Sequence, residues 1–142
     1  GVNATYWQNG LIALAPNLVT ILLGTNDQGL GDSPAVFRAN IQTMLTRIKA
    51  ALPYADIMLI MPCENQRVAN TYAMSAYATE IYELAAINKC AYLDLQYVFG
   101  DNAADYAFGT ARAWFASDLI HPDPTTGGRV ITDAVYRLLT TQ

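Results

Sequence analysis

The chain contains a single histidine, His121, which lies three residues after a carboxylate in the segment Asp118-Leu119-Ile120-His121-Pro122. On a turn, Asp118 can accept a hydrogen bond from the imidazole ring, which would fix the tautomer of the ring and stabilise the imidazolium. Any acid–base catalysis by an imidazole would therefore fall to His121. The same spacing also fits a surface ion pair or a residue at the start of a helix. A metal site that adds Asp123 is a weaker hypothesis, since one histidine with spaced carboxylates is a poor metal signature.

A second group that could do chemistry is the carboxamide of Asn26, in the segment Gly24-Thr25-Asn26-Asp27 that directly follows the apolar run Leu18–Leu23. The glycine allows the chain to enter a tight turn, and the short side chain can donate hydrogen bonds from its NH2 group. Glycine, asparagine and aspartate are also the usual residues of ordinary turns. Alone, this segment does not separate a binding site from a plain turn.

Three short apolar runs predict the strands that would position these groups: Leu18–Leu23, Ile57–Met61 and Ala91–Leu95. The first two are continuous and end at Gly24 and Pro62, which is typical of strands buried on both faces of a parallel sheet. Apolar residues at helical spacing predict helices over residues 34–52, 74–85 and 130–139. A further helix over residues 6–14 is expected before the first strand. Strands that alternate with helices predict right-handed βαβ connections in an α/β fold with both faces of the sheet covered.

In an open α/β sheet, ligands bind outside the carboxyl ends of the strands. The candidate site should therefore gather residues that follow Leu23, Met61 and Leu95, including the polar segment Glu64-Asn65-Gln66-Arg67. No repeat, linker or low-complexity segment interrupts the chain, so we expect residues 1–142 to form a single domain.

Composition narrows the classes of function. With 142 residues, of which 53% are hydrophobic and 14% charged, the chain can form a globular core and is unlike a disordered protein. Its eight lysines and arginines are scattered and its formal charge is −4, which disfavours a nucleic-acid partner. The apolar runs are much shorter than the roughly 20 residues of a membrane-spanning helix. Cys63 and Cys90 would lie at opposite ends of neighbouring strands, which predicts two free thiols and neither a disulfide nor a zinc site.

Taken together, the segment Gly24–Asp27, the segment Asp118–Pro122 and the amphipathic helix expected after it resemble the third and fifth conserved blocks of the SGNH (GDSL-type) hydrolases. Residues 1–5, Gly-Val-Asn-Ala-Thr, look like the second block, so the resemblance covers the chain from its first residue to its last. These hydrolases are esterases, lipases and carbohydrate deacetylases. The resemblance implies a flavodoxin-like, three-layer α/β/α fold with a parallel sheet, and an ester hydrolase that uses no cofactor and no metal.

The resemblance also implies a role for each matching residue. His121 would be the general base, and Asp118 the carboxylate that orients it. Asn26 would donate its side-chain amide to the oxyanion of a tetrahedral intermediate. Gly1 would donate a backbone N–H to the same oxygen, provided that a peptide bond precedes it.

The nucleophilic serine of the family belongs to its first block, a Gly-Asp-Ser that precedes the second block. The segment Gly31-Asp32-Ser33 has the same letters, but it follows the turn at Asn26, and Ser33-Pro34 is better explained as the N-cap and first residue of a helix. We therefore expect that the first strand of the sheet and the serine lie outside this chain. The chain would then be the C-terminal part of a larger domain, or one piece of a split domain whose partner is the missing N-terminal segment.

Aromatic residues are frequent in residues 98–117, where they could stack on a sugar or simply pack the loop onto the core. The lack of a long apolar flap disfavours a lipase, which leaves a small ester or an acetylated carbohydrate as the expected substrate. The alternative is a non-catalytic module on the same fold, either carbohydrate-binding or structural. The sequence itself does not specify a location, but members of the family are often secreted or attached to cell or virion surfaces, so the resemblance favours such a location.

Overall fold

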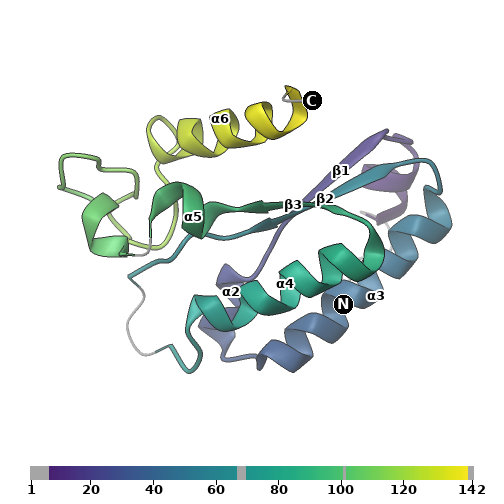
Figure 1. The fold of residues 1–142 in the computed structure, drawn as a ribbon, viewed down its shortest axis with the longest axis horizontal. Coiled ribbons are helices and arrows are strands. Elements are labelled where there is room, and N and C mark those ends of the chain that lie inside the picture. The colour runs from purple at the N-terminus through teal and green to yellow at the C-terminus, as the bar shows by residue number, and fades with distance from the viewer. Residues whose placement is uncertain (1–6, 67–69, 101, 141–142) are drawn as a thin grey trace.

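The computed structural model describes residues 7–66, 70–100 and 102–140, and a parallel sheet lies at its centre (Figure 1). The strands are β1 (Leu18–Leu22), β2 (Asp56–Met61) and β3 (Ala91–Asp94), in the order β1-β2-β3. The register pairs Leu18 with Asp56 and Met58 with Ala91, so the carboxyl ends of the strands meet at one edge. The predicted parallel α/β sheet is confirmed, and each strand begins and ends within about one residue of its predicted range.

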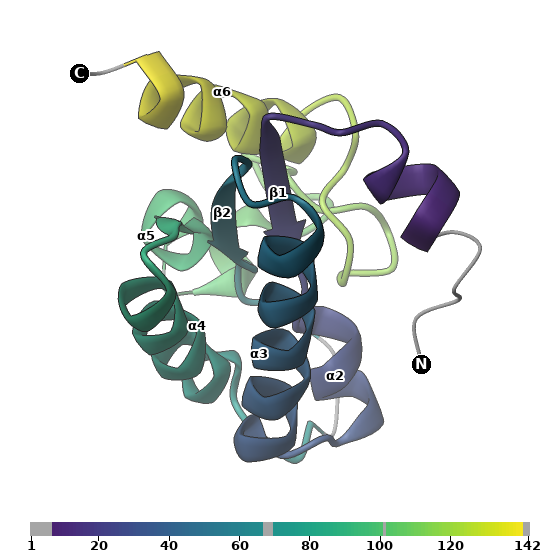
Figure 2. The same ribbon diagram turned by 90° about the vertical axis from the view of Figure 1, so that its right-hand side faces the viewer.

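Helices lie on both faces of the sheet, as Figures 1 and 2 show. One layer consists of α3 (Pro34–Ala51) and α4 (Met74–Asn88), and the other of α5 (Leu95–Phe99) and α6 (Gly127–Thr140). The described ranges also contain the short elements η1 (Gln8–Ile12), α2 (Thr25–Leu30) and η2 (Ala103–Tyr106). The result is the expected three-layer α/β/α arrangement. Within these ranges, no helix combines the length and the apolar character needed to cross a membrane.

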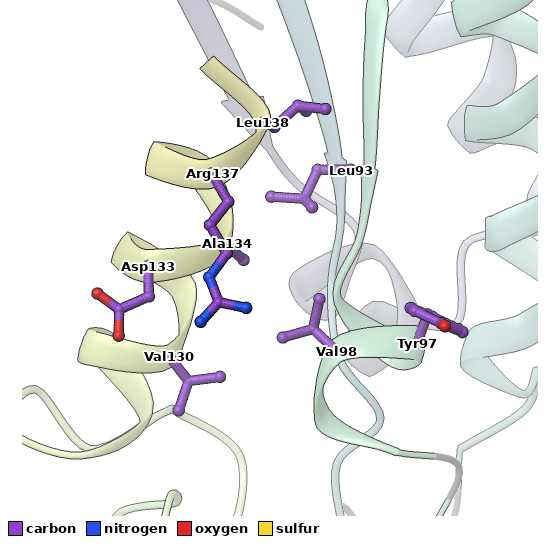
Figure 3. Close-up of a pocket in the computed structure, with 8 residues that line it drawn as sticks. All are labelled: Leu93, Tyr97, Val98, Val130, Asp133, Ala134, Arg137 and Leu138. Carbon is purple, nitrogen blue, oxygen red and sulfur yellow. The ribbon is translucent and has the colours of Figure 1, made fainter. Parts of the chain in front are cut away.

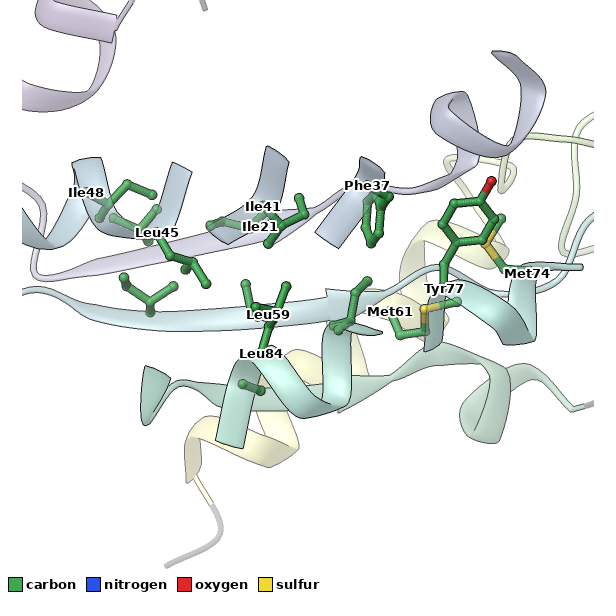
Figure 4. Close-up of a cluster of buried hydrophobic side chains, with 14 of the residues drawn as sticks. Ile21, Phe37, Ile41, Leu45, Ile48, Leu59, Met61, Met74, Tyr77 and Leu84 are labelled. Carbon is green, nitrogen blue, oxygen red and sulfur yellow. The ribbon is translucent and has the colours of Figure 1, made fainter. Parts of the chain in front are cut away.

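One face of the sheet, which we call the closed face, is formed by Val19, Ile21, Ile57, Leu59 and Met61. It lies under α3 and α4, whose buried side chains pack against it (Figure 4). The residues that α3 contributes follow the helical spacing of the sequence: Phe37, Ile41, Leu45 and Ile48. The Phe37 ring meets Tyr77 of α4 edge-on, with ring centroids 5.2 Å apart. Apolar periodicity therefore predicted this layer correctly.

The other face, which we call the open face, is formed by Leu18, Thr20, Leu22, Met58, Ile60 and Leu93. Met58 and Ile60 of the central strand are buried on this face, but the side chains that β1 places on the same face are exposed. The prediction that β1 is buried on both faces is wrong. The reason is geometric, since α6 packs mainly on β3 and α5 and leaves the β1 end of this face uncovered.

A groove of about 490 Å³ lies between α6 and the pair formed by β3 and α5 (Figure 3). Val130, Ala134 and Leu138 of α6 face Leu93 and Val98 across it. The apolar stripe of α6, which the sequence places toward a core, is therefore only partly buried. The layer that carries α6 is packed more loosely than the layer of α3 and α4.

Three short helical elements differ from the predictions. The segment Gly24–Asp27 was expected to be a turn, but Thr25 begins α2. Leu95 was expected to end a strand, but it begins α5, where the Asp94 side chain accepts hydrogen bonds from the backbone N–H groups of Gln96 and Tyr97. The helix expected over residues 6–14 is a short π-helical stretch in the described residues. Helices of five or six residues are too short to show an apolar period.

Ser33 and the two cysteines behave as predicted. The Ser33 hydroxyl accepts a hydrogen bond from the backbone N–H of Val36 at 3.3 Å, and Pro34 is the first residue of α3. Cys63 and Cys90 are both free thiols. Burial raises the pKa of Cys63 to about 12, so this thiol stays protonated at neutral pH.

Candidate active site

Asp118 holds the segment that carries His121 in shape. Its Oδ1 accepts hydrogen bonds from the backbone N–H groups of Ile120 and His121, each at 2.9 Å. Its Oδ2 lies 2.7 Å from Nδ1 of the His121 ring. One carboxylate therefore closes the turn and orients the imidazole at the same time. Leu119, inside this turn, has a left-handed φ of 60°, which the three hydrogen bonds to Asp118 help to maintain.

The electrostatics of this pair suit a base. The backbone N–H of His121, its ring and the backbone N–H of Ile120 hold the pKa of Asp118 well below its usual range. The carboxylate is therefore ionised at neutral pH, and it favours the tautomer with the proton on Nδ1 of His121. This leaves Nε2 as the basic nitrogen, on a side chain that is 65% exposed.

The backbone on either side of His121 is anchored to the rest of the loop. Phe115 and Pro122 form an antiparallel bridge, and Ala116 donates a hydrogen bond to the carbonyl oxygen of His121 at 2.9 Å. After this bridge the chain enters α6 at Gly127, where a Cβ would lie only 2.0 Å from the carbonyl oxygen of Trp114. Only glycine permits this close approach, which presses the start of α6 against the loop that bears His121.

Asp123, the third residue of the metal hypothesis, has a structural task. Its Oδ1 accepts hydrogen bonds from the backbone N–H groups of Thr125 and Thr126, at 2.8 and 3.1 Å, just before α6. A hydrogen bond from the Thr125 hydroxyl, together with these two backbone hydrogen bonds, lowers the pKa of Asp123. No group of three or more His, Cys, Asp or Glu side chains that could hold a metal occurs in the described part of the chain.

Asn26 is the second residue of α2, directly beyond the carboxyl end of β1. Gly24 makes this junction, with a φ of 130° that side-chain-bearing residues rarely adopt. The Gly24 carbonyl then accepts a hydrogen bond from the backbone N–H of Gln28 at 2.9 Å, which forms the first turn of the helix. The structure thus presents the Asn26 side chain in an exposed position at the edge where a ligand is expected.

A cavity of about 50 Å³ connects the two predicted segments. Thr25, next to Asn26, lines one side, while Ile120 and Pro122, which flank His121, line the other. Leu22 and Cys63 contribute walls from the ends of β1 and β2. The segments that carry Asn26, Asp118 and His121 therefore meet at the carboxyl edge of the sheet. Gly1 lies outside the described residues, and its role stays a prediction.

The buried amide of Gln28 is a functional candidate that sequence reasoning missed, and so is its pairing with Asn65. Both amides are buried, and Asn65 Nδ2 donates a hydrogen bond to Gln28 Oε1 at 2.8 Å. Asn65 belongs to the polar segment predicted to border the crevice, but its partner lies 37 residues away. No pattern within a short stretch of sequence predicts a contact between residues that far apart.

The aromatic residues of the loop before His121 mostly pack against one another. Phe99 makes edge-on contacts with Tyr106 and Trp114, with ring centroids 5.4 and 5.2 Å apart. The guanidinium of Arg112 lies over the Trp114 ring at 5.0 Å. Phe108 alone among the five large aromatics of residues 99–115 is exposed. This geometry favours loop packing over a broad sugar-stacking surface.

A sequence profile of the GDSL-like Lipase/Acylhydrolase family matches residues 2–126. The chain belongs to this family. The match includes both the Asn26 segment and the Asp118–His121 segment, and the resemblance noted from the sequence is confirmed. Among curated proteins, no sequence matches the chain.

Solved structures share the fold of this GDSL-like chain. A putative GDSL-like lipase from Parabacteroides merdae superimposes with a TM-score of 0.73 at 20% identity, over 92% of this chain and 63% of its own. A protein from Lactobacillus plantarum gives a TM-score of 0.78 at 19% identity, over 99% and 74%. An acetylxylan esterase from Geobacillus stearothermophilus gives 0.73 at 18% identity, over 97% and 66%. The chain thus spans about two thirds of the length of these proteins.

Proposed function

We propose that this chain carries the base and the oxyanion donor of a serine ester hydrolase. His121 is the general base, Asp118 orients it, and Asn26 donates its side-chain N–H to the oxyanion. The observation that carries this proposal is the 2.7 Å contact between Asp118 Oδ2 and His121 Nδ1, within a turn that the same carboxylate closes. Membership of a family of lipases and acylhydrolases supports ester hydrolysis as the reaction in which this pair takes part.

In the proposed reaction, Nε2 of His121 removes the proton of a serine hydroxyl while the serine Oγ bonds to the carbonyl carbon of the ester. The negative charge on the former carbonyl oxygen is stabilised by the Asn26 amide, and the charge of the imidazolium by Asp118. Collapse of this intermediate breaks the bond to the alcohol, which leaves with the proton from Nε2. Water then attacks the acyl-serine by the same sequence of proton transfers and releases the acid.

The serine, in this proposal, comes from a segment outside these 142 residues. Ser33, the serine of the Gly-Asp-Ser segment, is occupied as the N-cap of α3. In the described sheet, β1 pairs only with β2, and its Leu18 and Leu22 side chains are exposed on the open face. A parallel strand added along this edge would end beside the cavity at Thr25 and Ile120, within reach of the base. A peptide bond to such a segment would also give Gly1 the backbone N–H that its proposed oxyanion role needs.

For the substrate we propose an acetyl or short-chain ester, carried on a carbohydrate. Structural similarity to an acetylxylan esterase supports this class. We propose hydrolysis as the activity of the protein. If the serine is absent, the alternative is a non-catalytic carbohydrate-binding or structural module.

The test compares variants of the protein that includes the serine-bearing segment. We expect His121→Ala to lower turnover of acetylated xylo-oligosaccharides and of p-nitrophenyl acetate by roughly 10³-fold or more. Asn26→Ala should lower kcat by about 10²–10³-fold, as for the loss of one oxyanion donor. Asn40→Ala, an exposed asparagine on α3, is the matched control and should leave turnover unchanged. Near-full activity in both site variants would overturn the proposal.

A further inference from the structure

Beneath the proposed site lies a buried pair of amides, Gln28 and Asn65, whose side chains are in residues only 1% and 7% exposed. Asn65 Nδ2 donates to Gln28 Oε1 at 2.8 Å, and Gln28 Nε2 donates to the carbonyl oxygen of Tyr72 at 3.2 Å. Buried amides are costly without partners, so each hydrogen bond strongly restricts where the other group can lie. This pair ties α2 to the loop that follows β2.

The same loop also contacts the two other segments around the site. The backbone N–H of Gln66 donates to the carbonyl oxygen of Leu119, inside the Asp118–His121 turn, at 3.0 Å. The Glu64 carbonyl oxygen accepts a hydrogen bond from the Tyr106 hydroxyl at 3.1 Å. Three consecutive residues therefore bind three different segments. Through these hydrogen bonds, the loop connects the helix that carries Asn26 to the turn that carries His121.

We infer that Asn65 is a positioning residue for the proposed hydrolysis, acting through Gln28 on the placement of Asn26. The helix α2 has only six residues, and an isolated helix of this length has little stability of its own. Gln28 lies two residues after Asn26, and its buried hydrogen bonds fix the helix relative to the His121 turn. This inference rests on the proposed function, because it assigns Asn65 a role in placing the oxyanion donor.

The structure contains a matched pair that is far from the site. Gln42 of α3 and Asn88 of α4 exchange side-chain hydrogen bonds at 3.3 and 2.9 Å. Asn88 ends α4, just before the amino end of β3, on the opposite edge of the sheet from Asn26. The two Gln–Asn pairs have the same chemistry, but only one touches the segments of the candidate site.

The experiment is a double-mutant cycle in the protein that includes the serine-bearing segment, assayed with p-nitrophenyl acetate. We expect Asn65→Ala to lower kcat by about tenfold or more with little change in KM, because a donor displaced by roughly 1 Å loses much of its effect. The variant with both Asn65→Ala and Asn26→Ala should be no slower than Asn26→Ala alone. Asn88→Ala should leave kcat unchanged, although it also removes a Gln–Asn hydrogen bond and lowers the denaturation midpoint.

Several results would overturn the inference. One is a double variant whose loss equals the product of the two single losses, and another is a folded Asn65→Ala protein with normal kcat. If Asn65→Ala does not fold, Gln28→Met removes the same hydrogen bond at similar volume and carries the same expectation. Unchanged turnover in Asn26→Ala would instead remove Asn26 from the proposed function, and the inference with it. If Asn26→Ala is slow and the losses of the two single variants multiply in the double variant, the inference about Asn65 fails but the proposed function stands.

Discussion

On the closed face of the sheet, Val19 and Ile21 of β1 are 8% and 7% exposed, whereas Leu18 and Leu22 on the open face of the same strand are 37% and 43% exposed. The closed face has two long helices packed on it, and the open face has α6 over only part of its width. The Asp118–His121 turn immediately precedes this more loosely packed layer. The comparison indicates that α3 and α4 bury the more completely packed face of the sheet, while the candidate site lies beside the incompletely covered layer.

Asp118→Asn should distinguish the candidate site most clearly from the closed face, because it should affect turnover much more than stability. The new amide can still accept the backbone hydrogen bonds at Oδ1, but its NH2 would face Nδ1 of His121 and favour the tautomer with the proton on Nε2. We expect turnover of an acetyl ester to fall by about 10³–10⁴-fold, since the base is then blocked. The thermal midpoint should change little.

The control for this change is Asp133→Asn, an exposed carboxylate on α6, which should leave both turnover and midpoint unchanged. Equal losses of turnover in the two variants would show that charge near α6, and not the orientation of His121, matters. A large loss of stability in Asp118→Asn would show that the turn is part of the folding core and would break the comparison.

The next largest effect is a difference in the free energy of unfolding between two leucine variants, one at Leu45 on α3 and one at Leu22 on the open face. Leu45 is fully buried, so Leu45→Ala should lower the free energy of unfolding of the 142-residue chain by about 2–5 kcal/mol. Leu22→Ala should lower it by less than about 1 kcal/mol, as for a surface position. Urea denaturation followed by circular dichroism measures both values.

The same pair of leucines sharpens the comparison when the serine-bearing segment is present. If that segment adds a strand beside β1, its own open-face side chains should pack against Leu22. The loss for Leu22→Ala should then increase while that for Leu45→Ala stays the same. Equal losses for the two leucines in the 142-residue chain alone would contradict the description of the β1 end of the open face as uncovered.

How much the sequence predicts depends on whether the signal is local. The apolar runs, the spacing of Phe37, Ile41 and Leu45, and the Ser33-Pro34 cap are all local patterns, and the structure confirms the elements that they predict. The helix α2 was missed because Gly24, Asn26 and their neighbours are typical turn residues, and six residues are too few to show a period.

The candidate site divides in the same way. Asp118 and His121 could be found because their chemistry and their three-residue spacing are visible together. Asn65 and Gln28 could not be paired, since only the packing of α2 against the loop after β2 brings them into contact. Similarly, the composition of β1 shows that it is apolar, but the exposure of Leu22 depends on where α6 lies.

In the proposed mechanism, His121 activates a serine that lies outside these 142 residues. The most direct measurement is reaction of the protein that includes the serine-bearing segment with a fluorophosphonate, which bonds to an activated serine Oγ with loss of fluoride, followed by mass mapping of the labelled peptide. We expect one labelled serine, outside residues 1–142, and loss of labelling in His121→Ala. Labelling of Ser33 or of any other serine within residues 1–142, or ester hydrolysis with no labelled serine, would contradict this mechanism.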